Sequence, residues 1–370
     1  SEEGFTPLDE ILSATGDQHG QKVESFMDNL VRRGFLERTG VSEMETFPSI
    51  SVIIPVYNRP DDISTCLDSL LRLDYPKEKL EIIVVDDAST DETPEVVSRY
   101  PIKLITNPIN RQAPYCRNLG AETARGEILA FIDSDCLADR TWLRELVPTF
   151  KDPEIAAVGG IVESYFHKRP LDRYEQVCSS LKMGLWPKRS ANNNPFFYVP
   201  SCNLLVCRAV FLQIGGFNES LKVGEDVDLC WRIQHRGLHI DYLPSGRVLH
   251  KHRYRVGAFC KRRFDYGTSE PLLNRLYPGK IKKMVFTPLA FLFWTGLILT
   301  VLLKSAWLLV FPLGILGCEA VFKVHNLKQN RIIIPFNMIA VSVARKYVAF
   351  LYHGCAFFSR YYLIWLSLIH

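Results

Sequence analysis

From Ile50 onward, short apolar segments alternate with segments of helical pattern, and this alternation limits the folds that are open to the chain. The apolar segments are predicted strands, at residues 51–56, 82–85, 103–106 and 128–132. The helical patterns lie between them, at residues 61–73, 94–99 and 114–123. Strands that alternate with helices form a mainly parallel sheet. We therefore expect an α/β domain over residues 49–270, with further strands at 156–162, 204–207 and 239–243 and a helix at 225–236.

Acidic residues follow two of these predicted strands at their carboxyl ends. Asp86 and Asp87 end one strand, and Asp133-Ser134-Asp135 follows another. Open α/β sheets bind their ligands at this edge. Two carboxylates on one turn suit Mg²⁺ or Mn²⁺, which commonly bridges protein oxygens to a diphosphate. A metal-held nucleotide is the leading hypothesis, and a solvated turn of ordinary polar residues is the alternative.

The first predicted strand ends at Pro55-Val56-Tyr57-Asn58, which puts the Tyr57 ring where a flat base could stack. The carboxylates at the same edge are placed to accept hydrogen bonds from a base or a ribose. Neither strand end carries a Gly-x-Gly-x-x-Gly or Gly-Lys-Ser/Thr pattern. The predicted sheet is therefore not of the dinucleotide or phosphate-loop kind.

These segments together resemble the family 2 glycosyltransferases. The resemblance covers about residues 49–266 and rests on residues 52–58, 84–91 and 133–135, with Arg117-Asn118-Leu119-Gly120 and Gly215-Gly216-Phe217 in similar places. It implies a nucleotide-diphospho-sugar transferase fold of type A. The implied donor is a nucleotide sugar, a UDP-sugar in preference to a GDP-sugar.

The same resemblance implies a role for each residue at the predicted edge. Tyr57 and Asp87 would lie near the base, Asp133 near the ribose, and Asp135 on the metal. The remaining residues of the predicted donor site are Pro55, Asp86, Arg117 and Ser134. From the residues alone, Arg117 could equally be an ordinary surface position of a helix.

Glu225 and Asp226 open the helix predicted at residues 225–236. Carboxylates in a first helical turn are favoured by the helix dipole, and this alone could explain both residues. The resemblance instead implies that Asp226 is the general base, which takes the proton of an acceptor hydroxyl while the metal neutralises the departing diphosphate. A single displacement of this kind inverts the anomeric centre. Gly215, Gly216 and Glu225 are predicted near the acceptor or the diphosphate.

His250 and His252 follow a strand-like segment and a turn that contains Pro244, and either imidazole could complete the metal site. The resemblance favours His250 as the ligand, with a plain polar histidine as the alternative. A basic stretch follows at residues 251–263. This stretch, which includes Lys251, Arg262 and Arg263, is predicted to neutralise the diphosphate, and contact with anionic lipid headgroups is the competing use. Residues 260–264 read Cys-Lys-Arg-Arg-Phe, where processive members of the family have Gln-x-x-Arg-Trp. This departure argues against a polymer-extruding synthase.

Two regions flank the predicted catalytic domain. Residues 1–45 resemble the small winged-helix domains that hold precursor peptides, and a helical cap on the next domain is the alternative. Residues 280–370 contain charge-free runs at 285–303 and 306–318, which predict a membrane hairpin, with a buried helix pair as the alternative. Lysines on both flanks predict that the catalytic domain of this membrane protein is cytoplasmic.

Composition limits the partners. The net charge is +4 over 370 residues, and no basic helix with interleaved aromatics is present, so we expect no nucleic acid partner. The 10 cysteines are scattered without a Cys-x-x-Cys pair, which argues against a disulfide framework or a structural zinc site.

In overall order the chain resembles the glycosyltransferases of mycofactocin gene clusters, which have a winged-helix-like start and an apolar tail. This implies a peptide-derived redox cofactor as the acceptor. Transfer to a polyprenyl phosphate or another lipid is the alternative. A membrane-anchored scaffold that binds a peptide is the alternative of a different class, and the intact Asp133, Asp135 and Asp226 argue against it.

Overall fold

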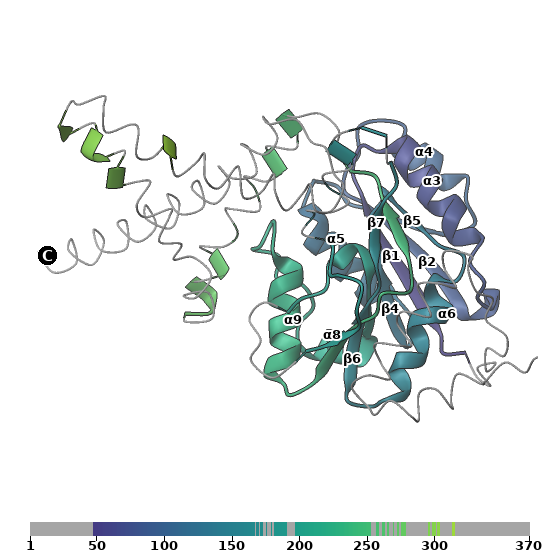
Figure 1. Cartoon of the computed structure of the whole chain (residues 1–370). Coiled ribbons are helices and arrows are strands. Elements are labelled where there is room, and N and C mark those ends of the chain that lie inside the picture. The colour runs from purple at the N-terminus through teal and green to yellow at the C-terminus, as the bar shows by residue number, and fades with distance from the viewer. Residues whose placement is uncertain are drawn as a thin grey trace, which may run out of the picture. The chain divides into compact units, whose positions relative to one another are not determined.

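The computed structural model describes residues 47–166, 181–190 and 197–252 without a break, and scattered positions within 168–179 and 257–314 (Figure 1). The unit predicted at residues 1–45 lies outside the described residues, as does most of the predicted hairpin. Within the described residues, no helix has both the length and the apolar character that crossing a membrane requires. Packing divides the described residues into two units, and those of the first lie within the ranges Ser1–Tyr165, Ser180–Glu219 and Glu225–Lys251.

An eight-stranded sheet forms the centre of the first unit, in the order β3-β2-β1-β4-β9-β6-β10-β8. Strands β1 to β4 run parallel, as do β6 and β10, whereas β9 is antiparallel to both of its neighbours. The predicted mainly parallel sheet is thus confirmed. Its strands are β1 (Ile50–Val56), β2 (Leu80–Asp86), β3 (Lys103–Thr106), β4 (Ile128–Phe131), β6 (Ile155–Gly159), β8 (Lys188–Arg189), β9 (Leu204–Cys207) and β10 (His239–Tyr242).

Helices cover both faces of this sheet (Figure 1). Strand β1 shows why, since Val52 and Ile54 pack into one apolar cluster and Ile53 into another, and all three are fully buried. A strand with two buried faces needs helices on both sides. The first cluster includes residues of α3 (Pro60–Leu71), α4 (Thr93–Ser98) and α6 (Trp142–Leu146), and the second includes residues of α5 (Gln112–Thr123), α8 (Arg208–Gln213) and α9 (Glu225–His235).

Helix α3 follows β1 directly, and its sequence explains where it begins. Pro60 stands at the first position of the helix, where its missing N–H costs nothing, and Asp61 and Asp62 favour the positive end of the helix dipole. Ile63, Cys66, Leu67 and Leu70 repeat at helical spacing and are buried against the sheet. Short 3₁₀ helices occur elsewhere at Lys77–Lys79, Val147–Lys151 and Ser201–Asn203.

A second, three-stranded sheet has the order β5-β11-β7, with β5 (Cys136–Ala138), β11 (Val248–His250) and β7 (Val162–Ser164). Strand β11 runs antiparallel to β5, and His250 is paired with Cys136. The segment predicted as one strand at residues 156–162 is divided between β6 and β7. Gly160 lies between them, and the carbonyl oxygen of Gly246 approaches it so closely that any Cβ would clash. The small sheet therefore places His250 beside the turn that follows β4.

Candidate active site

The carboxyl ends of β1, β2 and β4 meet at one edge of the large sheet, as predicted. Val56 at the end of β1 is paired with Asp86 at the end of β2. Asn58 fixes the adjoining turns, since its backbone N–H donates to Ser89 Oγ at 2.9 Å and its side-chain oxygen accepts from the Thr90 N–H at 2.8 Å. Pro55 is buried in β1, whereas the Tyr57 side chain is 45% exposed. An exposed ring at this edge is available to a planar ligand.

Asp86 and Asp87 lie in different surroundings. The Asp87 carboxylate accepts hydrogen bonds from the backbone N–H groups of Arg111, at 2.8 Å, and Gln112, at 2.7 Å, and from the Asn107 amide at 3.0 Å. It therefore holds the start of α5. Burial raises the pKa of Asp86, and no described residue donates a hydrogen bond to its Oδ1. Contact of either carboxylate with a base stays a prediction.

Arg117 is buried, with a side chain only 3% exposed, and it forms ion pairs with two carboxylates. Its Nη2 lies 2.7 Å from Asp133 Oδ1, and its Nη1 lies 2.9 Å from Glu225 Oε1. The nearby charges of Asp133 and Glu225 raise the pKa of Arg117 in spite of its burial. Arg117 thus joins the turn after β4 to the first turn of α9, a contact that sequence reasoning did not foresee.

Replacing Arg117 with Met is expected to lower the free energy of unfolding by about 3 kcal/mol, because two half-buried carboxylates lose their buried counter-charge. Urea unfolding of the full chain measures the loss. Arg144→Met is the matched control, since Arg144 pairs with Asp74 at the surface and such a pair contributes about 0–1 kcal/mol. Equal losses in the two variants would contradict a structural role for Arg117.

Glu225 and Asp226 open α9, as predicted. Burial, together with the negative charge of Glu225, raises the pKa of Asp226 to about 7. Asp226 Oδ1 accepts a hydrogen bond from the Val227 N–H at 2.8 Å. A carboxyl group with a pKa near neutrality is suited to take up a proton during a reaction at physiological pH. Asp226 therefore has the properties of a general base.

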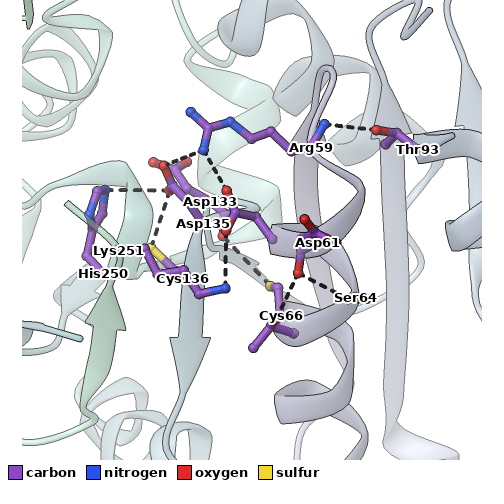
Figure 2. Close-up of polar contacts among 12 residues, drawn as sticks. Arg59, Asp61, Ser64, Cys66, Thr93, Asp133, Asp135, Cys136, His250 and Lys251 are labelled. Carbon is purple, nitrogen blue, oxygen red and sulfur yellow. Dashed lines mark hydrogen bonds and ion pairs between the residues drawn. The ribbon is translucent and has the colours of Figure 1, made fainter. Parts of the chain in front are cut away.

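Asp135 and His250 form the candidate metal site. Asp135 Oδ1 lies 3.6 Å from His250 Nε2, and both side chains are largely buried. Two ligand atoms on one ion stand about 3–3.5 Å apart when each metal bond is about 2.1 Å long, so the pair suits a small divalent cation. Figure 2 shows His250 and Arg59 approaching Asp135 from different sides.

Cys136 is a third potential ligand in the same place, because its Sγ lies 4.0 Å from Asp135 Oδ1. The thiol packs into the apolar core, and burial raises its pKa well above the usual value. A protonated thiol is a poor ligand. The donor set of one carboxylate oxygen and one imidazole nitrogen therefore suits Mg²⁺ or Mn²⁺, with other positions left to the oxygens of a diphosphate or water.

Arg59 and Asp62 adjoin this pair and were missed by sequence reasoning, and Lys251, the first residue of the predicted basic stretch, adjoins it as well. Arg59 Nη1 lies 2.9 Å from Asp62 Oδ2 and 3.1 Å from Asp135 Oδ2. Lys251 Nζ lies 3.1 Å from Asp62 Oδ1, and the Lys251 N–H donates to the Asp135 carbonyl at 2.9 Å. From the sequence, Arg59 and Asp62 look like ordinary residues at the start of a helix.

The other predicted site residues are placed as follows. Ser134 is buried in the turn between Asp133 and Asp135. Gly215 and Gly216 have φ values of +81° and +66° in the turn after α8, which the Asn118 and Arg232 side chains hold through hydrogen bonds to the turn backbone. These contacts explain both glycines without a ligand. Arg262 is half-buried in the second unit, and Arg263 lies outside the described residues.

Comparison with known proteins agrees with this arrangement. Residues 51–211 match the model of the family described as glycosyl transferase family 2. A pre-mycofactocin glycosyltransferase of Mycobacterium tuberculosis is 32% identical over 250 residues, which are 66% of this chain and 52% of that protein. The chain therefore spans about half the length of that relative. Glycosyltransferase AglE of Haloferax volcanii is 30% identical over 229 residues, 57% of this chain and 73% of AglE.

The fold has a solved counterpart. It is similar to the mannosyltransferase PcManGT from Pyrobaculum calidifontis, solved in complex with GDP-Man and Mn²⁺. The TM-score is 0.56 at 20% sequence identity, covering 94% of this chain and 99% of that one. The predicted type A transferase fold is thereby confirmed. Taken with the sequence matches, these findings show that the chain belongs to glycosyl transferase family 2.

Proposed function

We propose that this chain is an inverting, metal-dependent glycosyltransferase, which moves a sugar from a nucleotide-diphosphate donor to an acceptor hydroxyl. One observation carries the proposal. Arg117 ties Asp133, in the turn expected to hold the donor, to Glu225, which adjoins the candidate base Asp226. A group that binds the departing nucleotide and a group that takes up a proton are therefore joined through one buried side chain. Displacement at an anomeric carbon needs both.

The donor would be held by residues at the sheet edge. The exposed Tyr57 ring is available for stacking on the base, and the Asp133 carboxylate, which Arg117 orients, is available to a ribose hydroxyl. Asp135 and His250 would hold Mg²⁺ or Mn²⁺. When bound, the metal supplies positive charge that stabilises the diphosphate as it leaves.

Asp226 would act on the acceptor. In this step the acceptor oxygen forms a bond to the anomeric carbon while the bond from that carbon to the diphosphate oxygen breaks. The hydroxyl proton passes to the Asp226 carboxylate, and the electron pair of the broken bond leaves with the diphosphate. Because attack and departure occur on opposite faces, the anomeric configuration is inverted.

The pH dependence of kcat/KM should reflect Asp226. Activity requires the ionised carboxylate, so kcat/KM is expected to rise with pH and level off above a midpoint near the Asp226 pKa of about 7. Glu225→Gln removes the negative charge that raises this pKa, so the midpoint should move to lower pH. A profile measured from pH 5 to 9 tests this, and an unshifted midpoint in the variant would contradict the assignment.

The direct test of the function is nucleotide binding to the full chain in detergent. Calorimetric titration with UDP and GDP, each with Mn²⁺ and with a chelator, should show metal-dependent binding of one nucleotide. A screen of the matching nucleotide sugars then identifies the donor. Absence of binding under every condition would overturn the proposal and favour a peptide-holding scaffold.

A peptide-derived acceptor is proposed because the relative from M. tuberculosis is named a pre-mycofactocin glycosyltransferase. Labelled product made with a lipid phosphate acceptor would partition into organic solvent, whereas a modified peptide would stay in water. Attachment of the apolar tail to the cell membrane, with the catalytic domain on the cytoplasmic side, is likewise proposed. Release of the chain from membranes by alkaline carbonate would contradict it.

A further inference from the structure

Four charged side chains form a compact group at the candidate metal site. Arg59 contacts both Asp62 and Asp135, and Lys251 contacts Asp62. Figure 2 shows the Arg59 guanidinium beside Asp135. In this group Arg59 and Lys251 are the two cations, and Asp62 is the carboxylate that anchors both of them. Arg59 comes from the turn after β1, Asp62 from α3, and Lys251 directly follows β11. Two segments far apart in the sequence, one with Arg59 and Asp62 and the other with Lys251, therefore bring two cations to one carboxylate.

The charges of this group are informative. Its two cations and two carboxylates cancel, so the group is neutral as it stands. A divalent cation on Asp135 would give the group two positive charges. The diphosphate of a nucleotide sugar carries two negative charges, so the group matches the donor only after the metal has bound.

Arg59 pairs with two carboxylates, Asp135, which is a candidate metal ligand, and Asp62, which is not. Arg59 lies on Asp135 Oδ2, while His250 lies on the other oxygen of that carboxylate. A metal held between Oδ1 and His250 would weaken the attraction of Asp135 for Arg59. Asp62 would keep the guanidinium in place, since both Arg59 and Lys251 contact it. The Arg59 side chain is 30% exposed and the Lys251 side chain 15%, so both adjoin solvent.

We propose that Arg59 and Lys251, anchored by Asp62, bind the diphosphate of the donor, and that Arg59 weakens metal binding until that diphosphate is present. This inference rests on the proposed function of the site. It makes metal and diphosphate binding mutually reinforcing, because each neutralises the charge that opposes the other. Arg59 then makes the site specific for diphosphates over monophosphates. It lies outside the sequence motifs on which the family resemblance rests.

The test measures two ligands separately on the full chain. Mn²⁺ binding without nucleotide is followed by the electron paramagnetic resonance signal of the free ion. UDP and UMP binding at saturating Mn²⁺ is followed by calorimetry, with GDP and GMP instead if the wild type prefers guanine. UMP keeps the base, the ribose and one phosphate and lacks only the terminal phosphate. Comparing the two nucleotides isolates the contribution of the diphosphate.

Arg59→Met should change the two affinities in opposite directions. The Mn²⁺ affinity is expected to rise by a factor of about 3 to 10, because a competing positive charge beside Asp135 is removed. The UDP affinity is expected to fall by about 10- to 100-fold, the usual effect of losing a charged hydrogen bond, with a smaller change for UMP. Loss of folding would not produce a gain in metal affinity.

Two further variants sharpen the result. Lys251→Met should weaken UDP binding with little change in Mn²⁺ affinity, because the Lys251 side chain contacts Asp62 and not the Asp135 carboxylate. Arg144→Met should alter neither affinity. Equal losses of UDP and UMP binding in Arg59→Met, or an unchanged or weaker Mn²⁺ affinity, would overturn the inference. Failure of the wild type to bind either nucleotide would instead overturn the proposed function.

Discussion

Replacement of Asp226 by Asn is expected to abolish sugar transfer and to leave nucleotide binding close to that of the wild type. Asparagine keeps the size of the side chain and an oxygen that can accept the Val227 N–H, so α9 should begin as before. It cannot take a proton from an acceptor hydroxyl. Loss of a general base lowers kcat by about 10²- to 10⁴-fold. Turnover of the donor with and without acceptor, together with UDP titration, measures both properties.

The control for this variant is Glu219→Gln, which alters an exposed carboxylate that contacts Asn118 near the same helices. It should retain transfer. Turnover like that of the wild type in Asp226→Asn would remove Asp226 from the role of base. A parallel loss of UDP binding and thermal stability would show instead that Asp226 supports the fold.

Replacement of Asp135 by Ala is expected to abolish metal-dependent nucleotide binding and, with it, sugar transfer. Asp135 supplies the carboxylate beside His250, and its side chain also contacts Arg59. Removing even an outer partner of a metal ligand typically costs 10- to 100-fold in affinity, so loss of a ligand should weaken Mn²⁺ binding by at least about 100-fold. Calorimetry with Mn²⁺ and then with UDP measures the effect.

Asp68→Ala provides the comparison, since Asp68 is an exposed carboxylate on α3 that contacts Tyr100. It should bind Mn²⁺ and UDP as the wild type does. Metal-dependent UDP binding that survives in Asp135→Ala would move the metal site elsewhere. Nucleotide binding that never depended on metal, in either variant or in the wild type, would contradict a metal-dependent mechanism.

The long central strands could be predicted from the sequence within two residues of their observed ends. Each of β1, β2 and β4 is an almost unbroken apolar run, because both faces of the sheet are covered, and such runs have few alternatives. The short strands β5, β8 and β11 were not predicted. Strands of two or three residues carry no periodic pattern, and pairing with distant segments defines them.

The candidate site was predictable only where residues follow strands. Asp133, Asp135 and Tyr57 were placed at the edge because strand direction alone determines their position. The contact between Arg117 and Glu225 and the contact between Arg59 and Asp135 join residues separated by more than seventy positions in the chain. Charge pairs of this kind depend on tertiary packing, and no local spacing identifies them.

The pairing of β11 with β5 makes one strand register responsible for the candidate metal site. His250 is aligned with Cys136, the residue next to Asp135, by backbone hydrogen bonds across the small sheet. A shift of β11 by one residue would turn His250 to the opposite face, because neighbouring side chains of a strand alternate. The number of residues between β10 and β11 therefore matters more for the site than which residues they are. Among related proteins, insertions should be tolerated on the outer loops and excluded from this short connection.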